Sequence, residues 1–306
     1  MPRVRVLVTG GAGFVGSHVV DALVVRGDEV AVIDNLASGK RENVRDNASL
    51  HVQDIREPLE ELFDELRPEA VFHLAAQADL RVAVERPHED AEVNVLGTIR
   101  VLEAARRYGA QVIFSSSGGA IYGECDRPAK ESAALSPISQ YGTSKLAGEE
   151  YLRTYNRLYG TIHVSLRYGN VYGPRQDPHG EAGVVAIFLG ALADGEQARI
   201  FGDGTQTRDY VYVGDVARAT VSALGQEGGV FNIGTGREVS VLELYERCRQ
   251  AAGSSADAEH APARLGELQR SVLDTDLAAE QLGFAAMVDL EDGLAATWDW
   301  VSAQKE

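Results

Sequence analysis

Tyr141 and Lys145 are the residues whose types and spacing most directly suggest chemistry. They stand four positions apart at the start of a helical stretch, so the phenol and the ammonium lie on one helix face. A free tyrosine has a pKa near ~10 and is a poor base at neutral pH. An adjacent ammonium favours the charged phenolate. The pair therefore predicts a tyrosine that removes a proton from a substrate hydroxyl.

Three hydroxyls form a second candidate group. Ser115, Ser116 and Ser117 come directly after an apolar run at the end of an expected strand. Strand ends deliver side chains to the binding edge of a parallel sheet. These serines are therefore expected near the carbonyl or alkoxide of a substrate, with a plain serine-rich turn as the alternative.

A glycine-rich turn supplies the third signal. The segment 9–16 reads Thr-Gly-Gly-Ala-Gly-Phe-Val-Gly and stands between an apolar run and a helical pattern. Glycines permit a tight turn and a close approach of backbone N–H groups to a pyrophosphate, which the helix N-terminus also attracts. Asp34, at the end of the second run, can accept hydrogen bonds from ribose hydroxyls and would repel a 2′-phosphate. NAD is therefore the expected cofactor, and its nicotinamide would further favour the Tyr141 phenolate.

The elements that must position these groups alternate between strands and helices. Near-continuous apolar strands between helices indicate an α/β fold of the Rossmann type, with a doubly wound parallel sheet. Gly27, Gly109 and Gly160 mark helix ends. The expected strands are Val4–Val8, Glu29–Ile33, Ala70–Leu74, Gln111–Ser115 and Ile162–Arg167, and the expected helices are Phe14–Arg26, Pro58–Leu66, Asp90–Tyr108 and Ser139–Tyr159.

After about residue 170 the pattern becomes rich in turns, which indicates a smaller C-terminal α/β substrate domain. We expect residues 1–169 to form the NAD-binding domain, to which the chain returns around 209–234. Residues 170–306 would form mainly the substrate domain, with 253–262 as a surface loop.

Composition narrows the function classes. The chain has 306 residues, a formal net charge of −17 and two cysteines. Such a charge disfavours nucleic acid as a partner, and two distant cysteines favour neither a disulfide framework nor a metal site. No apolar run is long enough for a membrane span, and the first residues lack the features of a signal peptide, so the cytoplasm is the expected location.

Together, the motif 9–16, Asp34-Asn-Leu36, Ser115–Gly123, the Tyr141/Lys145 pair and Arg208-Asp-Tyr210 resemble the extended short-chain dehydrogenase/reductases, and within them the UDP-glucose (UDP-galactose) 4-epimerases. The resemblance runs from residue 4 to about 284. It implies a 4-epimerase that interconverts UDP-glucose and UDP-galactose through a 4-keto intermediate, as in galactose metabolism. NAD⁺ would be reduced and reoxidised within one turnover.

The resemblance also assigns site residues. Tyr141, Lys145 and Ser117 would be catalytic, and Ser117 and Tyr141 would touch the sugar. Cofactor contacts would come from the strand-end loops and the catalytic pair: Gly10, Gly13, Phe14, Val15, Gly16, Asp34, Asn35, Ser38, Gly39, Asp54, Ile55, Leu74, Ala75, Ala76, Gln77, Asn94, Ser115, Tyr141, Lys145 and Tyr168.

The substrate's UDP group would be held by Asn170, by Arg208 and by the pair Arg264 and Glu267. Arginine suits this role because its planar fork makes bidentate contacts to phosphate. Ser271 falls where the family has either tyrosine or a small residue beside the C2 group of the sugar. Its small side chain predicts room for an N-acetyl group, and hence activity on UDP-GlcNAc and UDP-GalNAc as well.

The sequence leaves the catalytic hydroxyl and the exact reaction open. Counting back from Tyr122 places the family's catalytic hydroxyl on Gly118, whereas counting along the strand places it on Ser117, with Ser116 also open. Dehydratases and decarboxylases of the family carry an acid after that hydroxyl, where this chain has Gly118, Gly119 and Ala120. The competing functions are a nucleotide-sugar reductase and, from another class, a non-catalytic NAD-sensing protein. The family pattern also implies a homodimer formed by helices 90–108 and 139–159.

Overall fold

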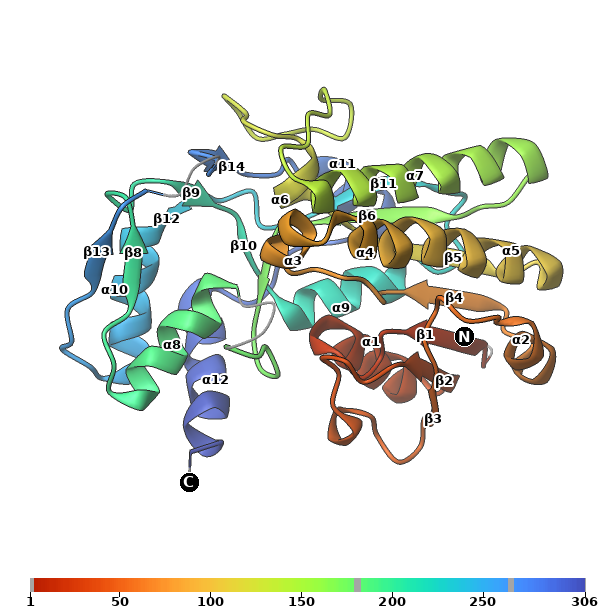
Figure 1. Cartoon of the computed structure of the whole chain (residues 1–306), viewed down its shortest axis with the longest axis horizontal. Helices are drawn as coiled ribbons and strands as arrows, with labels where there is room; N and C mark the ends of the chain where they lie inside the picture. Colours follow the sequence, from red (N-terminus) through yellow and green to blue (C-terminus); the bar gives the residue numbers. More distant parts are fainter. Residues whose placement is uncertain (1–2, 179–182, 264–266, 306) are drawn as a thin grey trace.

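The structure, a computed structural model, describes residues 3–178, 183–263 and 267–305. Its centre is a sheet of seven parallel strands (Figure 1). In spatial order they are β11 (Gly229–Ile233), β6 (Val164–Tyr168), β5 (Gln111–Ser117), β4 (Ala70–His73), β1 (Arg5–Thr9), β2 (Glu29–Asp34) and β3 (Ser49–Val52). The order reverses between β1 and β4, the switch point at which doubly wound sheets bind ligands.

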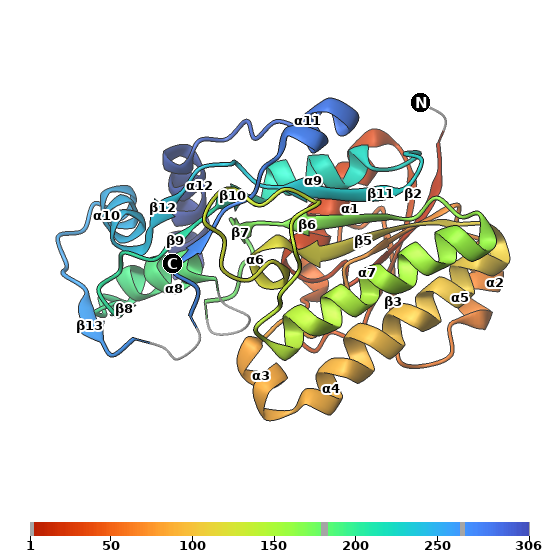
Figure 2. The same cartoon turned by 90° about the horizontal axis from the view of Figure 1, so that it is seen from above.

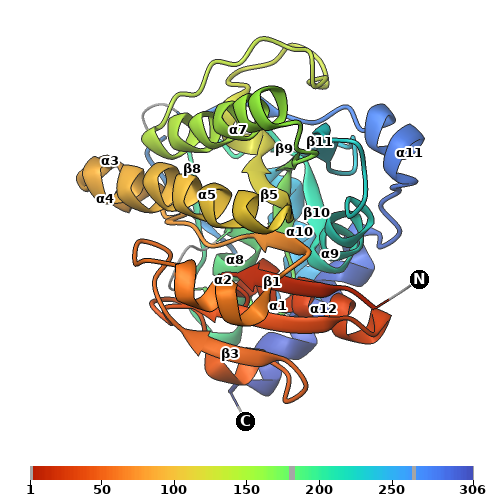
Figure 3. The same ribbon diagram turned by 90° about the vertical axis from the view of Figure 1, so that its right-hand side faces the viewer.

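Helices cover both faces of this sheet because alternate strand residues point to opposite sides (Figure 3). Val6 and Val8 face one helix layer, whereas Leu7 faces the other. The first layer contains α1 (Phe14–Arg26), α9 (Val213–Ser222) and α11 (Asp276–Leu282), and the second contains α2 (Glu60–Leu66), α5 (Thr98–Tyr108) and α7 (Gln140–Tyr159). The Rossmann-type fold predicted from the sequence is therefore confirmed.

A second, smaller region holds three helices and the short strands outside the main sheet (Figure 1, left). Helices α8, α10 and α12 share one apolar core with the strands beside them. Their bounds are α8 (Val184–Asp194), α10 (Val241–Ala252) and α12 (Leu290–Ala303); the strands pair as β7 (Asn170–Tyr172) with β10 (Tyr210–Tyr212), β8 (Arg199–Phe201) with β13 (Glu259–Ala261), and β9 (Thr207–Arg208) with both β12 (Val239–Ser240) and β14 (Arg270–Ser271).

The chain passes between the two regions more than once. Residues 170–212 lie mainly in the second region, after which α9 packs on α1 and β11 extends the main sheet beside β6. The domain bounds at residues 169 and 209–234 stay a prediction, because a chain that crosses repeatedly has no single boundary.

Helix ends follow their predicted chemistry. Helix α1 spans the predicted residues, and Gly27, Gly109 and Gly160 all adopt the left-handed conformation at the ends of α1, α5 and α7. Ser139 caps α7 by accepting a hydrogen bond from the Gly142 N–H. The helix predicted from residue 58 begins only at Glu60.

The helix predicted over 90–108 is present as a continuous helical run over 87–108, but its middle is not α-helical. It consists of α4 (Pro87–Ala91), a π-helical segment, Glu92–Gly97, and α5, and the short helix α3 (Leu80–Glu85) precedes it. A single π-helical segment is too short for apolar periodicity to reveal. Figure 2 shows α3 and α4 beside one end of α7.

Two strand predictions also need correction. Strand β5 continues past residue 115 to Ser117, because its ladder with β6 extends to the Ser117–Tyr168 pair. Strand β6 begins at Val164 rather than at residue 162. Within the predicted 253–262 loop, β13 pairs with β8. Among the described residues, no helix has both the length and the apolarity that crossing a bilayer requires.

Candidate active site

A cleft of about 530 Å³ opens at the carboxyl ends of the parallel strands and extends to the second region. Parallel strands deliver their C-terminal loops to one edge of the sheet, which brings distant segments together. Most of the predicted residues line this cleft: Gly10, Gly13, Phe14, Val15, Gly16, Asp34, Asn35, Ser38, Asp54, Ile55, Leu74, Ala75, Ala76, Ser115, Ser116, Ser117, Tyr141, Lys145, Tyr168 and Asn170.

The glycine turn is packed so closely that side chains are excluded. Gly10 has a φ of +71°, and a Cβ there would lie 2.6 Å from the Ala75 nitrogen. A Cβ on Gly16 would overlap the Gly10 carbonyl oxygen. This bare backbone, followed by the N-terminus of α1, has the form of a cradle for a pyrophosphate.

Asp34 lies at the end of β2 and is held in place by backbone groups. One carboxylate oxygen accepts a hydrogen bond from the Ala12 N–H at 2.9 Å, and the other accepts one from the Leu36 N–H at 2.8 Å. Gly39 does not line the cleft, but a Cβ at that position would lie 2.7 Å from the Asp34 carboxylate. Gly39 therefore makes room for the acid.

Asp54 follows β3 and faces the same end of the cleft. It accepts hydrogen bonds from the Arg56 guanidinium and from the Asn35 amide. The hydrogen bond from Arg56 lowers the pKa of the Asp54 carboxyl to about 2. The acid is therefore charged at neutral pH and keeps Asn35 beside it.

The predicted catalytic residues Tyr141 and Lys145 lie beside the end of β5, which carries the three serines, in the cleft. Lys145, on α7, donates a hydrogen bond from Nζ to the Ser115 carbonyl oxygen at 2.9 Å. The same ammonium lies 5.8 Å from the centre of the Tyr141 ring. The phenol, the ammonium and the end of β5 are thus fixed relative to one another.

The two serines that compete for the catalytic role differ in environment. The Ser116 hydroxyl donates to the Glu149 carboxylate at 2.5 Å, and the residue is buried. Ser117 is the half-buried last residue of β5, and alternate strand residues point to opposite faces. This geometry favours Ser117 over Ser116 as the hydroxyl that faces a substrate.

Gln77 and Asn94 do not line the cleft. The Asn94 amide accepts from the Gln77 N–H and donates to the Gln77 carbonyl, to the Asp90 carboxylate and to the Ser144 hydroxyl. Because these contacts occupy its polar atoms, Asn94 fixes the loop after β4 against α7. Direct contact of either residue with the cofactor stays a prediction.

The predicted substrate clamp is only partly within the described residues. Arg264 lies outside the described residues, and Glu267 pairs with Arg208 at 3.5 Å. The Arg208 guanidinium also donates to the Thr207 carbonyl oxygen. Buried Ser271, on β14, lies beside Arg208 in the strand ladder. These three described residues lie together, although they are not among the residues that line the cleft.

Two residues that sequence reasoning missed line the second half of the cleft. Gln176 is 8% exposed, and its side-chain oxygen has no hydrogen-bond partner. Tyr210 is 5% exposed, and its hydroxyl also lacks a partner. Burial raises the pKa of the Tyr210 hydroxyl, and the positive charge of nearby Arg208 offsets only part of this rise. Buried polar atoms without partners are rare, and these two belong to residues that line the cleft. The signal in the sequence for Gln176 is its position after a turn-rich segment, whereas Tyr210 belongs to the Arg208-Asp-Tyr210 motif.

A side chain at the position after Ser117 would have to displace Leu273. A Cβ on Gly118 would lie 2.7 Å from both terminal methyl groups of Leu273, a fully buried residue. A Cβ added to Gly119 would lie 3.4 Å from the amide oxygen of the Asn170 side chain. The described residues contain no group of three or more acidic, histidine or cysteine side chains that could hold a metal ion.

Comparison with known proteins agrees with this geometry. A family model described as the NAD dependent epimerase/dehydratase family matches residues 6–234. A UDP-glucose 4-epimerase of Mycolicibacterium smegmatis is 47% identical over 303 residues, 96% of this chain and 97% of the relative. The crystal structure of a Thermotoga maritima UDP-glucose 4-epimerase with UDP-glucose has a TM-score of 0.96 and 47% identity, and covers 98% of this chain and 99% of that one. A Thermus thermophilus UDP-glucose 4-epimerase in complex with NAD has a TM-score of 0.93 and 48% identity, over 97% and 98% of the two chains.

Proposed function

Since the chain belongs to the NAD dependent epimerase/dehydratase family, we propose that it is an enzyme that interconverts UDP-glucose and UDP-galactose by transient oxidation at C4′. The observation that carries this proposal is the meeting of Tyr141, Lys145 and the end of β5 in one cleft with the glycine cradle. Oxidation at C4′ needs a redox-active cofactor to take the hydride from this carbon and a phenol to take the proton from its hydroxyl. The cleft brings the residues for both tasks together.

In this proposal Tyr141 takes the proton of the 4′-hydroxyl and later returns it. Lys145 stabilises the phenolate by its charge, and its bond to the Ser115 carbonyl keeps the ammonium in place. Ser117 donates a hydrogen bond to the 4′-oxygen, while Ser116 is occupied by Glu149. Ser117→Ala should therefore lower kcat strongly. Full activity of that variant would move the role to another hydroxyl.

The residues present fit NAD. The glycine cradle suits the pyrophosphate, and Asp34 at the end of β2 suits the adenosine ribose hydroxyls. NAD⁺, when bound, supplies the acceptor and donor of the hydride. The carboxylate of Asp34 should repel the 2′-phosphate of NADP. Equal binding of NADP and NAD in a titration would contradict this assignment.

A local cationic site accounts for an anionic substrate on an acidic protein. Arg208 would hold the diphosphate, and the unpartnered atoms of Tyr210 and Gln176 would be completed by the substrate. Arg264 and Asn170 are proposed as further contacts to the phosphates, and Glu267 as a contact to the uridine ribose.

Gly118 favours an epimerase over a dehydratase or a decarboxylase. Those reactions need an acid after the catalytic hydroxyl, and Leu273 occupies the space that a side chain at Gly118 would need. A nucleotide-sugar reductase is the second candidate, because it would use the same pair. Net consumption of NADH distinguishes it, since an epimerase leaves the total redox state unchanged.

The decisive experiment incubates the purified protein, without added cofactor, with UDP-galactose and, separately, with UDP-GlcNAc. Conversion of UDP-galactose to UDP-glucose with no net change in NADH is the expected result. Conversion of UDP-GlcNAc is also expected, because Ser271 is small. A protein that binds NAD yet converts no nucleotide sugar would favour the sensing alternative.

A homodimer and a cytoplasmic location complete the proposal. Exposed apolar side chains on α3, on the π-helical segment and on α7 (Val84, Leu96 and Tyr151) support a partner surface that includes the predicted helices. Leu96→Glu should convert a dimer into monomers in light scattering. Cell fractionation tests the location.

A further inference from the structure

A buried ion pair lies directly behind the catalytic groups. Glu149 on α7 and Arg167 on β6 pair at 2.6 Å, and their side chains are 0% and 2% exposed. Arg167 donates from both Nε and Nη2 to the two carboxylate oxygens of Glu149. Such a two-pronged contact fixes direction as well as distance. The pair therefore sets the spacing between α7 and the sheet.

On one side the pair reaches both elements that carry the proposed catalytic groups. Glu149 lies one helical turn after Lys145 and two turns after Tyr141, so the three share one face of α7. The Glu149 carboxylate also accepts the Ser116 hydroxyl of β5. Ser116 stands between the residue that binds Lys145 and the proposed Ser117.

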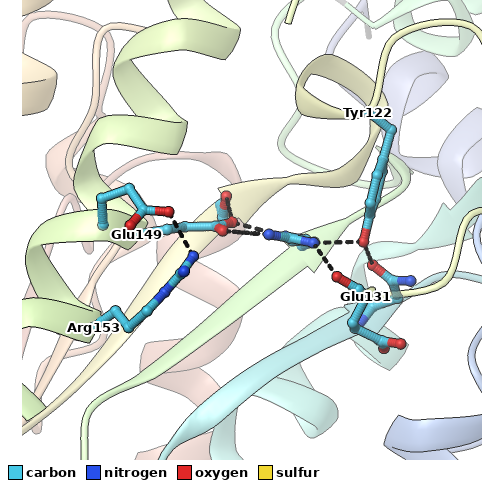
Figure 4. Close-up of polar contacts among 8 residues, drawn as sticks. Tyr122, Glu131, Glu149 and Arg153 are labelled. Atoms are coloured by element: carbon cyan, nitrogen blue, oxygen red, sulfur yellow. Dashed lines mark hydrogen bonds and ion pairs between the residues drawn. The ribbon is translucent and has the colours of Figure 1, made fainter. Parts of the chain in front are cut away.

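On the other side the pair is anchored in three further segments (Figure 4). The Arg167 guanidinium donates to the Tyr122 hydroxyl at 2.8 Å and to the Glu131 carbonyl oxygen at 3.2 Å. Tyr122 in turn donates to the Asn232 amide of β11 at 2.7 Å. Burial raises the pKa of Tyr122 to about 12, so its hydroxyl keeps the proton that this bond needs.

We infer that Glu149, oriented by Arg167, is a positioning residue that holds the Tyr141/Lys145 face of α7 at a fixed distance from the end of β5. This inference rests on the proposed function, and no part of the pair touches the substrate. The predicted consequence concerns the chemical step, because substrate and cofactor contacts lie elsewhere in the cleft.

A purely structural role would have different consequences. Removing one partner of a buried pair leaves an uncompensated charge and destabilises the whole fold. A positioning role, in contrast, lowers the rate in protein that is still folded and loaded. A displacement near 1 Å at reacting groups lowers rates by about 10²-fold.

The test uses full-length protein loaded with NAD and the variant Glu149→Gln, which keeps the shape of the side chain and removes its charge. We expect kcat for UDP-galactose to fall roughly 10- to 100-fold, while KM stays within about twofold. Two further readouts follow: the NAD content per chain, expected to be unchanged, and the rate at which NADH absorbance appears in the first turnover, expected to fall with kcat.

The neighbouring residue gives a matched control. Glu150 lies on the same helix and pairs with Arg153 at 2.5 Å, but both side chains are about half exposed (Figure 4). Glu150→Gln should leave kcat, KM and NAD content at wild-type values. Equal losses in Glu150→Gln and Glu149→Gln would overturn the inference.

If Glu149→Gln does not fold, Glu149→Asp decides. It keeps the charge beside Arg167 but withdraws the carboxylate by one methylene, so we expect folded protein with a lowered kcat and an unchanged KM. A folded Glu149 variant with wild-type kcat overturns the inference, as does one whose loss lies in KM. Failure of the proposed function is distinguishable, because wild-type protein would then convert no UDP-hexose at all.

Discussion

The two walls of the cleft differ in how completely their polar groups are paired. On the Rossmann side Lys145, Asp34 and Asp54 line the cleft, and all three have protein partners. On the other side, Gln176 and Tyr210 line the cleft with buried polar atoms that have none. The first wall is therefore arranged before any ligand arrives, whereas the second is completed by one.

This difference assigns separate tasks to the two walls. Pre-arranged groups act on the chemical step because they need no reorganisation when charge develops. Unpaired groups contribute to affinity, because a ligand that satisfies them relieves the cost of their burial. Changes on the Rossmann wall should therefore appear in kcat, and changes on the other wall in KM.

The largest expected effect comes from Tyr141→Phe. Loss of the phenol removes the proposed general base, so kcat for UDP-galactose should fall about 10²- to 10⁴-fold, with NAD content unchanged. The measurement is a coupled assay of epimerisation on NAD-loaded protein. Tyr151→Phe, on the exposed side of the same helix, is the control and should keep full activity. A Tyr141→Phe variant within twofold of wild type would remove the phenol from the mechanism.

Arg208→Ala tests the region behind the opposite wall, where Arg208 lies near Tyr210. The guanidinium is proposed to hold the diphosphate, and charged hydrogen bonds contribute about 1.5–3 kcal/mol each, so KM should rise roughly 10- to 100-fold. The change in kcat should be much smaller. Arg199→Ala removes an exposed arginine paired with Glu259 and should leave KM as it is. A loss confined to kcat would break the division between the walls.

Ser271→Tyr sharpens the same comparison within the substrate. The added ring should fill space beside the C2 group, so activity on UDP-GlcNAc should fall roughly tenfold relative to activity on UDP-galactose. Steady-state rates with both sugars give the ratio. Equal losses on the two sugars would show that the ring disturbs the site in general.

The smallest effect concerns stability and an exception on the Rossmann side, the buried His163, whose Nε2 atom has no hydrogen-bond partner. His163 lies directly before β6, and burial lowers its pKa to about 4. In the unfolded chain the imidazole binds a proton below pH ~6.5, whereas in the folded protein it stays neutral down to about pH 4. The free energy of unfolding therefore falls as the pH decreases from ~6.5 toward 4, by at most about 1.4 kcal/mol per pH unit. His163→Asn should remove that contribution in urea unfolding at several pH values.

The internal control is the difference in unfolding free energy between the His163→Asn variant and wild type. It should be constant above pH 7, where the histidine is neutral in both states, and should move in favour of the variant as the pH falls. A difference that stays constant down to pH 4 would mean that His163 takes up its proton in the folded protein.

Local patterns were sufficient for much of the fold and for predicting that the glycine turn, Asp34 and the Tyr141/Lys145 pair meet at one cleft. The glycine turn, Asp34 and the Tyr141/Lys145 spacing each lie within one short segment, and periodicity predicted helix α1 to the residue. Such segments also carried the resemblance to the epimerase family, which the family model and the relatives confirm. These signals are readable because neighbouring residues produce them.

Features that depend on distant contacts could not be predicted in this way. The partners of Glu149 come from two strands, and nothing in the sequence around it indicates that it is buried. Asn94 lies in the π-helical segment, which is too short for periodicity to reveal. The sequence therefore gives no sign that the Asn94 amide binds Gln77 and Asp90. Gln176 and Tyr210 have significance only through the burial that the folded chain gives them.

The seventh strand of the sheet has a consequence for biosynthesis. Because β11 is residues 229–233 of a chain of 306, a growing chain carries the whole catalytic pair long before it can close its central sheet. The Asn232 side chain of that strand also accepts the hydrogen bond that the Tyr122 hydroxyl donates. Domains usually fold as units during synthesis. Until about three quarters of the chain has been made, β6 is the edge strand of the sheet, a place that β11 takes in the finished protein. A truncated product ending before β11 would therefore expose β6, all of whose residues are buried in the complete fold, as an edge that can aggregate.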